Sequence, residues 1–245
     1  MCMGKVNICD YSDYDYKTEF WTKKNREYEH QLEFKLVNKL LKKYSTNGKS
    51  ICDAGCGFGR LFESYCHLFS EYHLVDYAKN LLKQAKDIYG MKKNIHFYKQ
   101  SLYELNICKK ADAIISIRTL HHLEDVDQLI KKLYDNLNEG GCLILDIPNH
   151  YHIKNKIKRP FSIKKNKIKV SAGYFNYNPQ FIIEKIQDSG FNIVDKRQVG
   201  LFRVGFIKQI FPPSMLISFE GILNMLLSSF NIGPSVYIVA KKQCG

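Results

Sequence analysis

The chain lacks long apolar runs, internal repeats and paired cysteines, and each absence bears on the class of protein. No stretch approaches the ~18 apolar residues of a membrane-spanning helix. No period of about 20–50 residues recurs, which excludes a solenoid. The eight cysteines form no C-x-x-C pair, and no His-x-x-x-His pattern accompanies them. We therefore expect reduced thiols and no metal site.

Acidic residues are scarce: 24 Asp and Glu oppose 37 Lys and Arg, for a net charge of +13. The excess is concentrated in Lys154–Lys169, because no acid occurs between Ile147 and Ile183. Such a basic segment suits contact with an anionic lipid, with RNA or with an anionic substrate; the alternative is a solvated loop. We expect no obligate protein partner.

Residues 1–15 are polar and rich in tyrosine, without the apolar centre of a signal peptide. We therefore expect a cytoplasmic protein, with a peripheral position at the inner membrane surface as a second location. The length of 245 residues and the hydrophobic content of 45% suit a single α/β domain with a packed core.

The most informative segment is Ile51–Leu61, which reads I-C-D-A-G-C-G-F-G-R-L. Its three glycines recur at every second position, between a short apolar run and a helix-like segment. Glycine lets the backbone turn sharply and lets a ligand approach closely. Such a strand-to-helix turn is where doubly wound α/β folds bind nucleotide-like ligands. Dinucleotide sites usually read G-x-G-x-x-G, so the pattern disfavours a nicotinamide-dependent oxidoreductase.

A second strand-like run, Tyr72–Asp76, ends in a carboxylate. Asp76 follows Gly59 at about the spacing at which such folds place an acid against the ribose hydroxyls of a ligand. The alternative role of Asp76 is to cap the helix that begins near Ala78.

Helix-like and strand-like segments alternate along the chain, which predicts a parallel sheet with helices on both faces. The expected helices are 19–43, 60–69, 78–89, 126–137 and 178–189, and the expected strands are 50–53, 72–76, 95–99, 113–117, 142–147, 191–197 and 235–241. Apolar residues also recur at helical spacing between Met215 and Phe230. That stretch is interpreted as core, as a lid over the acceptor or as a membrane-surface helix.

These features, in this order, resemble the class I S-adenosylmethionine-dependent methyltransferases, and most of all their type 11 group. The glycine turn preceded by Asp53 resembles motif I of that family. One position departs from the pattern, because Ser101 stands near where the family commonly has an acid that reaches adenine. Further matches are Asp112 at the start of strand four, Leu120–Asp125 (L-x-H-x-x-D), Leu137–Gly141 (L-x-P-G-G with Glu139 for proline) and the late helix that ends at Gly190-Phe191.

The resemblance implies an α/β fold with a doubly wound, seven-stranded mixed sheet, Rossmann-like, and insertions after strand five and between the last two strands. It also implies S-adenosylmethionine as methyl donor. The resemblance further implies that residues 1–245 form a single domain. Its parts are an N-terminal helical cap (1–48), a cofactor-binding core (49–148), a basic insertion (149–177) and a C-terminal part (178–245) with an apolar, lid-like insertion (201–233).

The resemblance implies a set of cofactor-binding residues, in which the glycine turn receives the methionine part and Asp76 the ribose. The set is Asp53, Gly55, Cys56, Gly57, Gly59, Asp76, Tyr77, Ser101, Leu102 and Ile117. Trp21, Arg26 and Tyr28 belong to an N-terminal segment that in related enzymes covers the cofactor or binds its carboxylate. The alternative is a helix that packs on the sheet through its aromatic residues.

His121 and His122 follow strand four, near the expected position of the transferred methyl group. Histidine has a pKa near neutrality, so either is a candidate general base. The alternative is a structural histidine that bonds the loop backbone. The expected function is methyl transfer to a small-molecule acceptor, with oxygen as the favoured atom and a lipid-like or amphiphilic acceptor as one form. The competing functions are an RNA or protein methyltransferase that grips its substrate through Lys154–Lys169, and a non-catalytic S-adenosylmethionine-binding protein.

Overall fold

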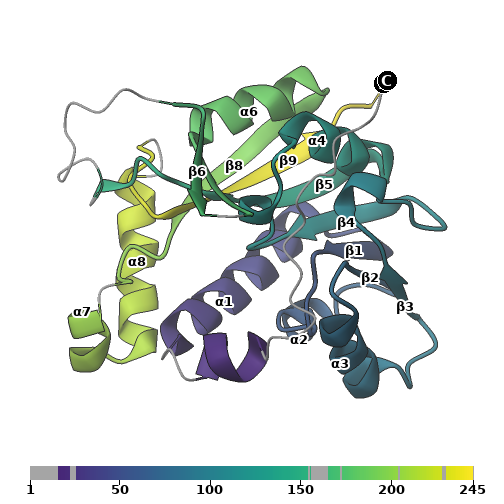
Figure 1. Cartoon of the computed structure of the whole chain (residues 1–245), viewed down its shortest axis with the longest axis horizontal. Helices are drawn as coiled ribbons and strands as arrows, with labels where there is room; N and C mark the ends of the chain where they lie inside the picture. Colours follow the sequence, from purple (N-terminus) through teal and green to yellow (C-terminus); the bar gives the residue numbers. More distant parts are fainter. Residues whose placement is uncertain are drawn as a thin grey trace.

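The computed structural model describes residues 16–22, 26–153, 155, 165–171, 173–203, 205–227 and 230–244. Seven strands form one sheet in the order β3-β2-β1-β4-β5-β9-β8 (Figure 1). All neighbouring strands in it run parallel except β9, which is antiparallel to both β5 and β8. The strands are β1 (Ser50–Ala54), β2 (Glu71–Asp76), β3 (Ile95–Lys99), β4 (Ala111–Ser116), β5 (Leu137–Pro148), β8 (Phe191–Val199) and β9 (Ser235–Lys242). This is the predicted seven-stranded mixed sheet.

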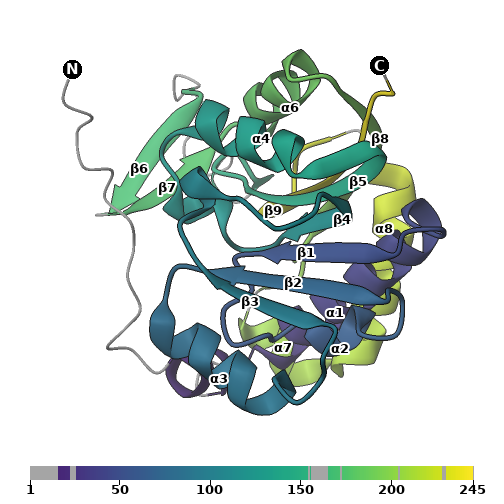
Figure 2. The same ribbon diagram turned by 90° about the vertical axis from the view of Figure 1, so that its right-hand side faces the viewer.

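Helices cover both faces of the sheet (Figures 1 and 2). One core joins α4 and α6 to the sheet, and a second core joins α1, α2 and α8 to the opposite face. The described helices are η1 (Tyr16–Thr22), α1 (Glu27–Tyr44), α2 (Phe62–Tyr65), α3 (Lys79–Tyr89), η2 (Leu102–Glu104), η3 (Leu120–His122), α4 (Val126–Asp135), α6 (Pro179–Asp188), α7 (Gly205–Ile210) and α8 (Pro213–Leu227).

Side-chain caps fix the start of the two helices on the first face. The Asp125 carboxylate accepts a hydrogen bond from the Gln128 amide at the start of α4. The Asn178 side chain accepts from the Gln180 amide, and Pro179 fills the first position of α6. Both are residues that favour helix N-termini for these reasons, so the predicted start of each helix lies within one residue of the observed one.

The structure also differs from the predicted elements. The expected helix 19–43 is two helices, η1 and α1, and the expected helix 60–69 shrinks to α2. Strand β5 starts at Leu137 rather than residue 142, because Leu137 already pairs with Ala111 of β4 across a register shift. A short hairpin of β6 (Lys167–Ser171) and β7 (Tyr174–Tyr177) lies in the basic insertion, where no strand was predicted.

Most of the basic segment Lys154–Lys169 lies outside the described residues. Of its cationic residues, Lys165, Lys167 and Lys169 are described, and all three are exposed. Lys167 forms an ion pair with Glu124, with 3.2 Å between Nζ and Oε1. No helix in the described ranges combines the length and the hydropathy needed to cross a membrane.

Candidate active site

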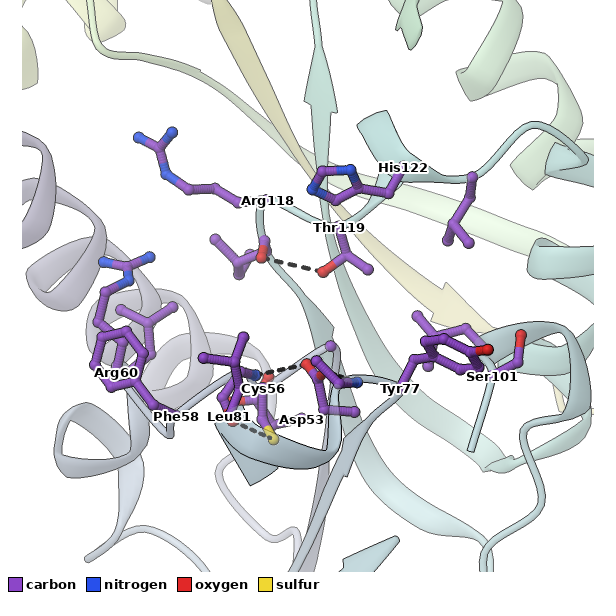
Figure 3. Close-up of a pocket in the computed structure, with 18 of the residues that line it drawn as sticks. Asp53, Cys56, Phe58, Arg60, Tyr77, Leu81, Ser101, Arg118, Thr119 and His122 are labelled. Atoms are coloured by element: carbon purple, nitrogen blue, oxygen red, sulfur yellow. Dashed lines mark hydrogen bonds between the residues drawn. The ribbon is translucent and has the colours of Figure 1, made fainter. Parts of the chain in front are cut away.

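A cavity of about 120 Å³ opens at the edge of the sheet where β1, β2, β3 and β4 end (Figure 3). In an open α/β fold this carboxyl edge is where ligands bind. Ten of the predicted cofactor-binding residues line the cavity: Trp21, Asp53, Gly55, Cys56, Gly57, Asp76, Tyr77, Ser101, Leu102 and Ile117. His122 lines it as well, whereas Gly59, Arg26, Tyr28 and His121 are not part of its wall.

The three glycines of the turn have three different roles. All have a positive φ: +92° at Gly55, +57° at Gly57 and +77° at Gly59. A Cβ on Gly55 would collide with the Thr119 side chain, and a Cβ on Gly59 would lie 2.9 Å from the Tyr89 ring. A Cβ on Gly57 would meet nothing nearer than Leu81 at 3.9 Å. Gly55 and Gly59 therefore allow close packing within the protein, and Gly57 keeps the space over the turn open for a ligand.

Asp76 is tied to the glycine turn. Its Oδ2 accepts a hydrogen bond from the Gly57 amide at 2.7 Å, and its Oδ1 accepts one from the Ala78 amide at 2.8 Å. Burial raises the pKa of this carboxyl, and the backbone donors oppose the rise. Asp76 thus bonds the backbone at the start of α3, as the capping alternative predicted. Its carboxylate also borders the cavity. Each oxygen retains lone pairs that can accept from a ligand hydroxyl.

Asp53 is a buried carboxylate in the floor of the cavity, with 3% of its surface exposed. Its Oδ2 accepts a hydrogen bond of 2.6 Å from the Tyr65 hydroxyl. Burial raises the pKa of Asp53 to about 7, although that hydrogen bond and the nearby Arg60 oppose the rise. A cation placed beside Asp53 would favour its ionised form.

A cluster of arginines around Glu33 borders the cavity. Glu33 of α1 is fully buried and lies 2.6 Å from Nη2 of Arg60, 2.7 Å from Nε of Arg118 and 3.8 Å from Nη2 of Arg203. Burial opposes ionisation of Glu33, yet the guanidinium groups of Arg118 and Arg60 hold its pKa at about 2. The three guanidinium groups outnumber the two carboxylates beside them, Glu33 and Asp146, which leaves this wall positive. Arg60 and Arg118 lie across the cavity from Tyr77 and Ser101 (Figure 3).

Arg118 has the one positive φ, +57°, among the described non-glycine residues. Its backbone amide donates to Oδ2 of Asp146 on β5 at 3.2 Å, while its side chain bonds Glu33. A left-handed backbone costs a residue with a Cβ about 1–2 kcal/mol. The hydrogen bonds of its backbone to Asp146 and of its side chain to Glu33 thus hold Arg118 in a strained conformation at the rim of the cavity. Such strain is common at functional sites.

Of the three N-terminal residues predicted to contact the cofactor, Trp21 lines the cavity, whereas Arg26 and Tyr28 do not. Trp21 lines the cavity, where its ring lies 3.8 Å from the Arg60 guanidinium carbon and 5.1 Å from that of Arg118. Arg26 stacks on the Phe20 ring at 3.9 Å. The structure contradicts a cofactor contact for Tyr28, which is 2% exposed and donates its hydroxyl to Glu220 of α8. The register of α1 turns Tyr28 towards α8, which is the packing alternative.

The two histidines lie under the β6–β7 hairpin. Their rings are 3.9 Å apart between centroids, and Tyr174 packs 4.6 Å from His122 and 5.5 Å from His121. Burial lowers the pKa of His122 to about 4, against a hydrogen bond to the Gly173 backbone. Burial also lowers the pKa of His121, helped by His122 and Arg118. Both are neutral at pH 7, and His122 is the one that faces the cavity (Figure 3).

Sequence reasoning missed Arg60, Thr119 and Glu33 as parts of the site, and it expected the backbone near Arg118 at the methionine side but not the Arg118 side chain. One signal was present: Glu33 occupies an apolar position of α1, four residues before Val37 and in line with Leu40 and Leu41. A carboxylate in an apolar stripe needs a buried cationic partner. Nothing local marks Arg118, because its role depends on contacts with Glu33 and Asp146 far away in the chain. Within the described part of the chain, no group of three or more His, Cys, Asp or Glu residues is placed to hold a metal ion.

Comparison with known proteins places these features in a family. Residues 52–143 match the model of a methyltransferase domain. The chain is 32% identical over 112 residues to malonyl-[acyl-carrier protein] O-methyltransferase of Bacillus anthracis, covering 44% of this chain and 41% of that protein. It is 26% identical over 184 residues to carboxy-S-adenosyl-L-methionine synthase of Campylobacter lari, covering 66% and 77%. The chain thus spans less than half the length of the first of these relatives.

Solved structures share the fold. An S-adenosylmethionine-dependent methyltransferase from Clostridium acetobutylicum superposes with a TM-score of 0.62 at 15% identity, over 94% of this chain and 96% of that one. Magnesium protoporphyrin IX methyltransferase from Synechocystis, solved with S-adenosylhomocysteine bound, gives a TM-score of 0.61 at 18% identity, over 91% and 88%. These structures confirm the predicted fold, and the methyltransferase domain match over residues 52–143 supports the predicted family resemblance. Residues 52–143 therefore match the methyltransferase domain family, within a chain that has the class I fold of S-adenosylmethionine-dependent methyltransferases.

Proposed function

We propose that this protein transfers the methyl group of S-adenosylmethionine to a carboxylate oxygen of a small molecule. The observation that carries the proposal is that a cavity lined by the predicted cofactor-binding residues contains a candidate base that is too weak to remove a proton from a neutral acceptor. The cofactor supplies an electrophilic methyl group on a positively charged sulfur, so the protein's part is to bind, orient and exclude water.

The lining of the cavity fits S-adenosylmethionine from end to end. Gly57 leaves open space above the turn, and Asp76 offers carboxylate lone pairs to the ribose hydroxyls. The family-like adenine position is bordered by Ser101 and Leu102, which lie away from Arg60 and Arg118 (Figure 3).

The opposite end of the cavity suits the charged methionine part. Asp53 is positioned to accept hydrogen bonds from an ammonium group, and the positive wall of Arg60 and Arg118 favours a carboxylate. Trp21 lies against the same two guanidinium groups and can exclude water from that end.

The choice of acceptor follows from His122. A general base is most effective when its pKa lies near the working pH, and the pKa of His122 is about 4. A carboxylate is already ionised at pH 7 and needs no base. Orientation alone supplies much of the rate when the nucleophile is ready to react. The O-methyltransferase activity in the name of the Bacillus relatives is consistent with an oxygen acceptor.

The experiment is a transfer assay with S-adenosylmethionine labelled in its methyl group, using small-molecule, protein and RNA fractions of a cell extract as acceptors. We expect label in the small-molecule fraction, and we expect mild alkali to release it as methanol, as a methyl ester requires. Alkali-stable label would contradict the carboxylate acceptor. Label in the RNA fraction, with strong salt dependence, would support the competing use of Lys154–Lys169 instead.

A further inference from the structure

Helix α8 attaches to the protein through the buried Leu216 and through two polar side chains. Glu220 is 1% exposed and accepts hydrogen bonds from the Gly200 amide at 2.7 Å and the Leu201 amide at 3.1 Å. Asn224 is 7% exposed; it accepts from the Gln198 amide at 2.7 Å and donates to the Gln198 carbonyl at 2.9 Å. The inner side of α8 thus uses a carboxylate and an amide to satisfy the backbone where β8 ends.

The outer side of α8 is apolar. Met215, Phe219, Ile222 and Leu226 follow one another at the spacing of a single helix face, and all are exposed, from 39% at Met215 to 72% at Leu226. Helix α7 and the turn after it add further exposed apolar side chains. We call the whole set the outer apolar face: Phe206, Ile210, Phe211, Met215, Phe219, Ile222, Met225 and Leu226.

This arrangement departs from the usual one, in which a surface helix turns most of its apolar residues inward. Glu220 is the one charged residue between Gln209 and Leu227, and it is buried, in a protein in which 25% of residues are charged. Many exposed apolar side chains on a segment almost without charge mark a site of interaction rather than a solvated surface.

Charge selects the kind of partner. The chain carries a net charge of +13, so two copies pressed together would repel each other. Helix α1 packs against α8, and its exposed positions include Lys35, Lys39 and Lys42. An apolar helix face next to a helix with exposed lysines matches an anionic lipid bilayer, where apolar side chains enter the acyl boundary and lysines meet the headgroups.

We infer that the outer apolar face docks this protein on the surface of an anionic lipid bilayer, with lysines of α1 at its edge. The helices lie in the interface and do not cross the membrane, since α7 and α8 have 6 and 15 residues. No residue of the outer apolar face lines the cavity, so the inference holds or fails independently of the proposed reaction.

The test is co-sedimentation of the full chain with vesicles of phosphatidylcholine alone or mixed with phosphatidylglycerol. We expect binding to the anionic vesicles and at least tenfold weaker binding to the neutral ones. The triple variant Phe219→Ser, Ile222→Ser, Leu226→Ser should lose at least tenfold in partitioning. The matched control, Ile88→Ser with Met91→Ser, removes exposed apolar residues in and after α3 and should bind like the wild type. Replacing Lys35, Lys39 and Lys42 with Gln should weaken binding to anionic vesicles alone.

Binding of S-adenosylhomocysteine by each variant, compared with the wild type, checks that the chain has kept its fold. Failure of the folded wild-type chain to bind anionic vesicles would overturn the inference, as would a triple variant that binds unchanged. Sedimentation velocity gives a further readout. A dimer that the triple variant dissociates would show that the face joins two copies of this chain, and would also overturn it.

Discussion

The Gly57 amide donates a 2.7 Å hydrogen bond to Oδ2 of Asp76, which joins the glycine turn after β1 to the end of β2. One carboxylate thus shapes the turn and borders the cavity that the turn encloses. A change at either residue is therefore expected to act on the ligand and on the loop together, and the tests below separate the two effects.

Asp76→Ala should weaken binding of S-adenosylmethionine by about 2–3 kcal/mol, the scale of hydrogen bonds to a charged group, or roughly 30- to 160-fold. The ribose contribution is isolated by repeating the calorimetric titration with a 2′,3′-dideoxy analogue. The analogue should bind the wild type weakly and lose much less on mutation. An equal loss with both ligands would mean that Asp76 acts by holding the loop alone.

Gly57→Ala and Gly140→Ala form a matched pair. Both glycines have a positive φ, +57° and +69°, and an added Cβ has room at both, with neighbours at 3.9 Å and 3.7 Å. Each variant should lose about 1–2 kcal/mol of unfolding free energy, the cost of a left-handed residue. Only Gly57→Ala should also lose at least tenfold in affinity for S-adenosylhomocysteine, because its Cβ enters the cavity. Equal affinities of the two variants would contradict the role of Gly57 in ligand approach.

The affinity for S-adenosylmethionine should depend on pH through Asp53. The pKa of this carboxyl is raised by burial to about 7, and the ligand's ammonium group binds its ionised form. Affinity should therefore fall up to tenfold for each pH unit below 7, since a proton must leave Asp53 on binding. Asp53→Asn should bind more weakly and without this slope. A slope that persists in the variant would assign the proton to another group.

His122→Asn tests whether a base is needed. The side-chain amide can keep a hydrogen bond to the Gly173 backbone, and it cannot take up a proton. With a carboxylate acceptor, the maximal rate should fall less than tenfold and its pH profile between 6 and 9 should stay flat. A fall of about a thousandfold, with loss of a titration step, would make His122 the general base.

The sequence predicted the succession of strands and helices along the chain and most of the cavity wall because these depend on local patterns. Glycines between a strand and a helix, and an acid at the end of the next strand, are meaningful wherever they occur. Tyr28 illustrates the limit. Its place in an amphipathic helix predicts burial, but its partner Glu220 lies 192 residues away and turns it from the cavity.

Two further features depend on contacts that no local pattern encodes. The polar inner side of α8 is determined by backbone groups at Gln198, Gly200 and Leu201 that need partners. The apolar periodicity of α8 therefore predicted a helix correctly but could not tell which side faces the protein. Likewise, Arg118 reaches its position only through Glu33 and Asp146.

The central claim is that the cavity beside Gly57 and Asp76 binds S-adenosylmethionine, and calorimetric titration of the purified chain tests it most directly. The account predicts saturable binding of S-adenosylmethionine and S-adenosylhomocysteine at one site per chain, with no heat from NAD. It also predicts a change in the fluorescence of Trp21, the single tryptophan, as the site fills. Binding of NAD in place of S-adenosylmethionine would contradict the claim. So would the absence of binding of both S-adenosylmethionine and S-adenosylhomocysteine.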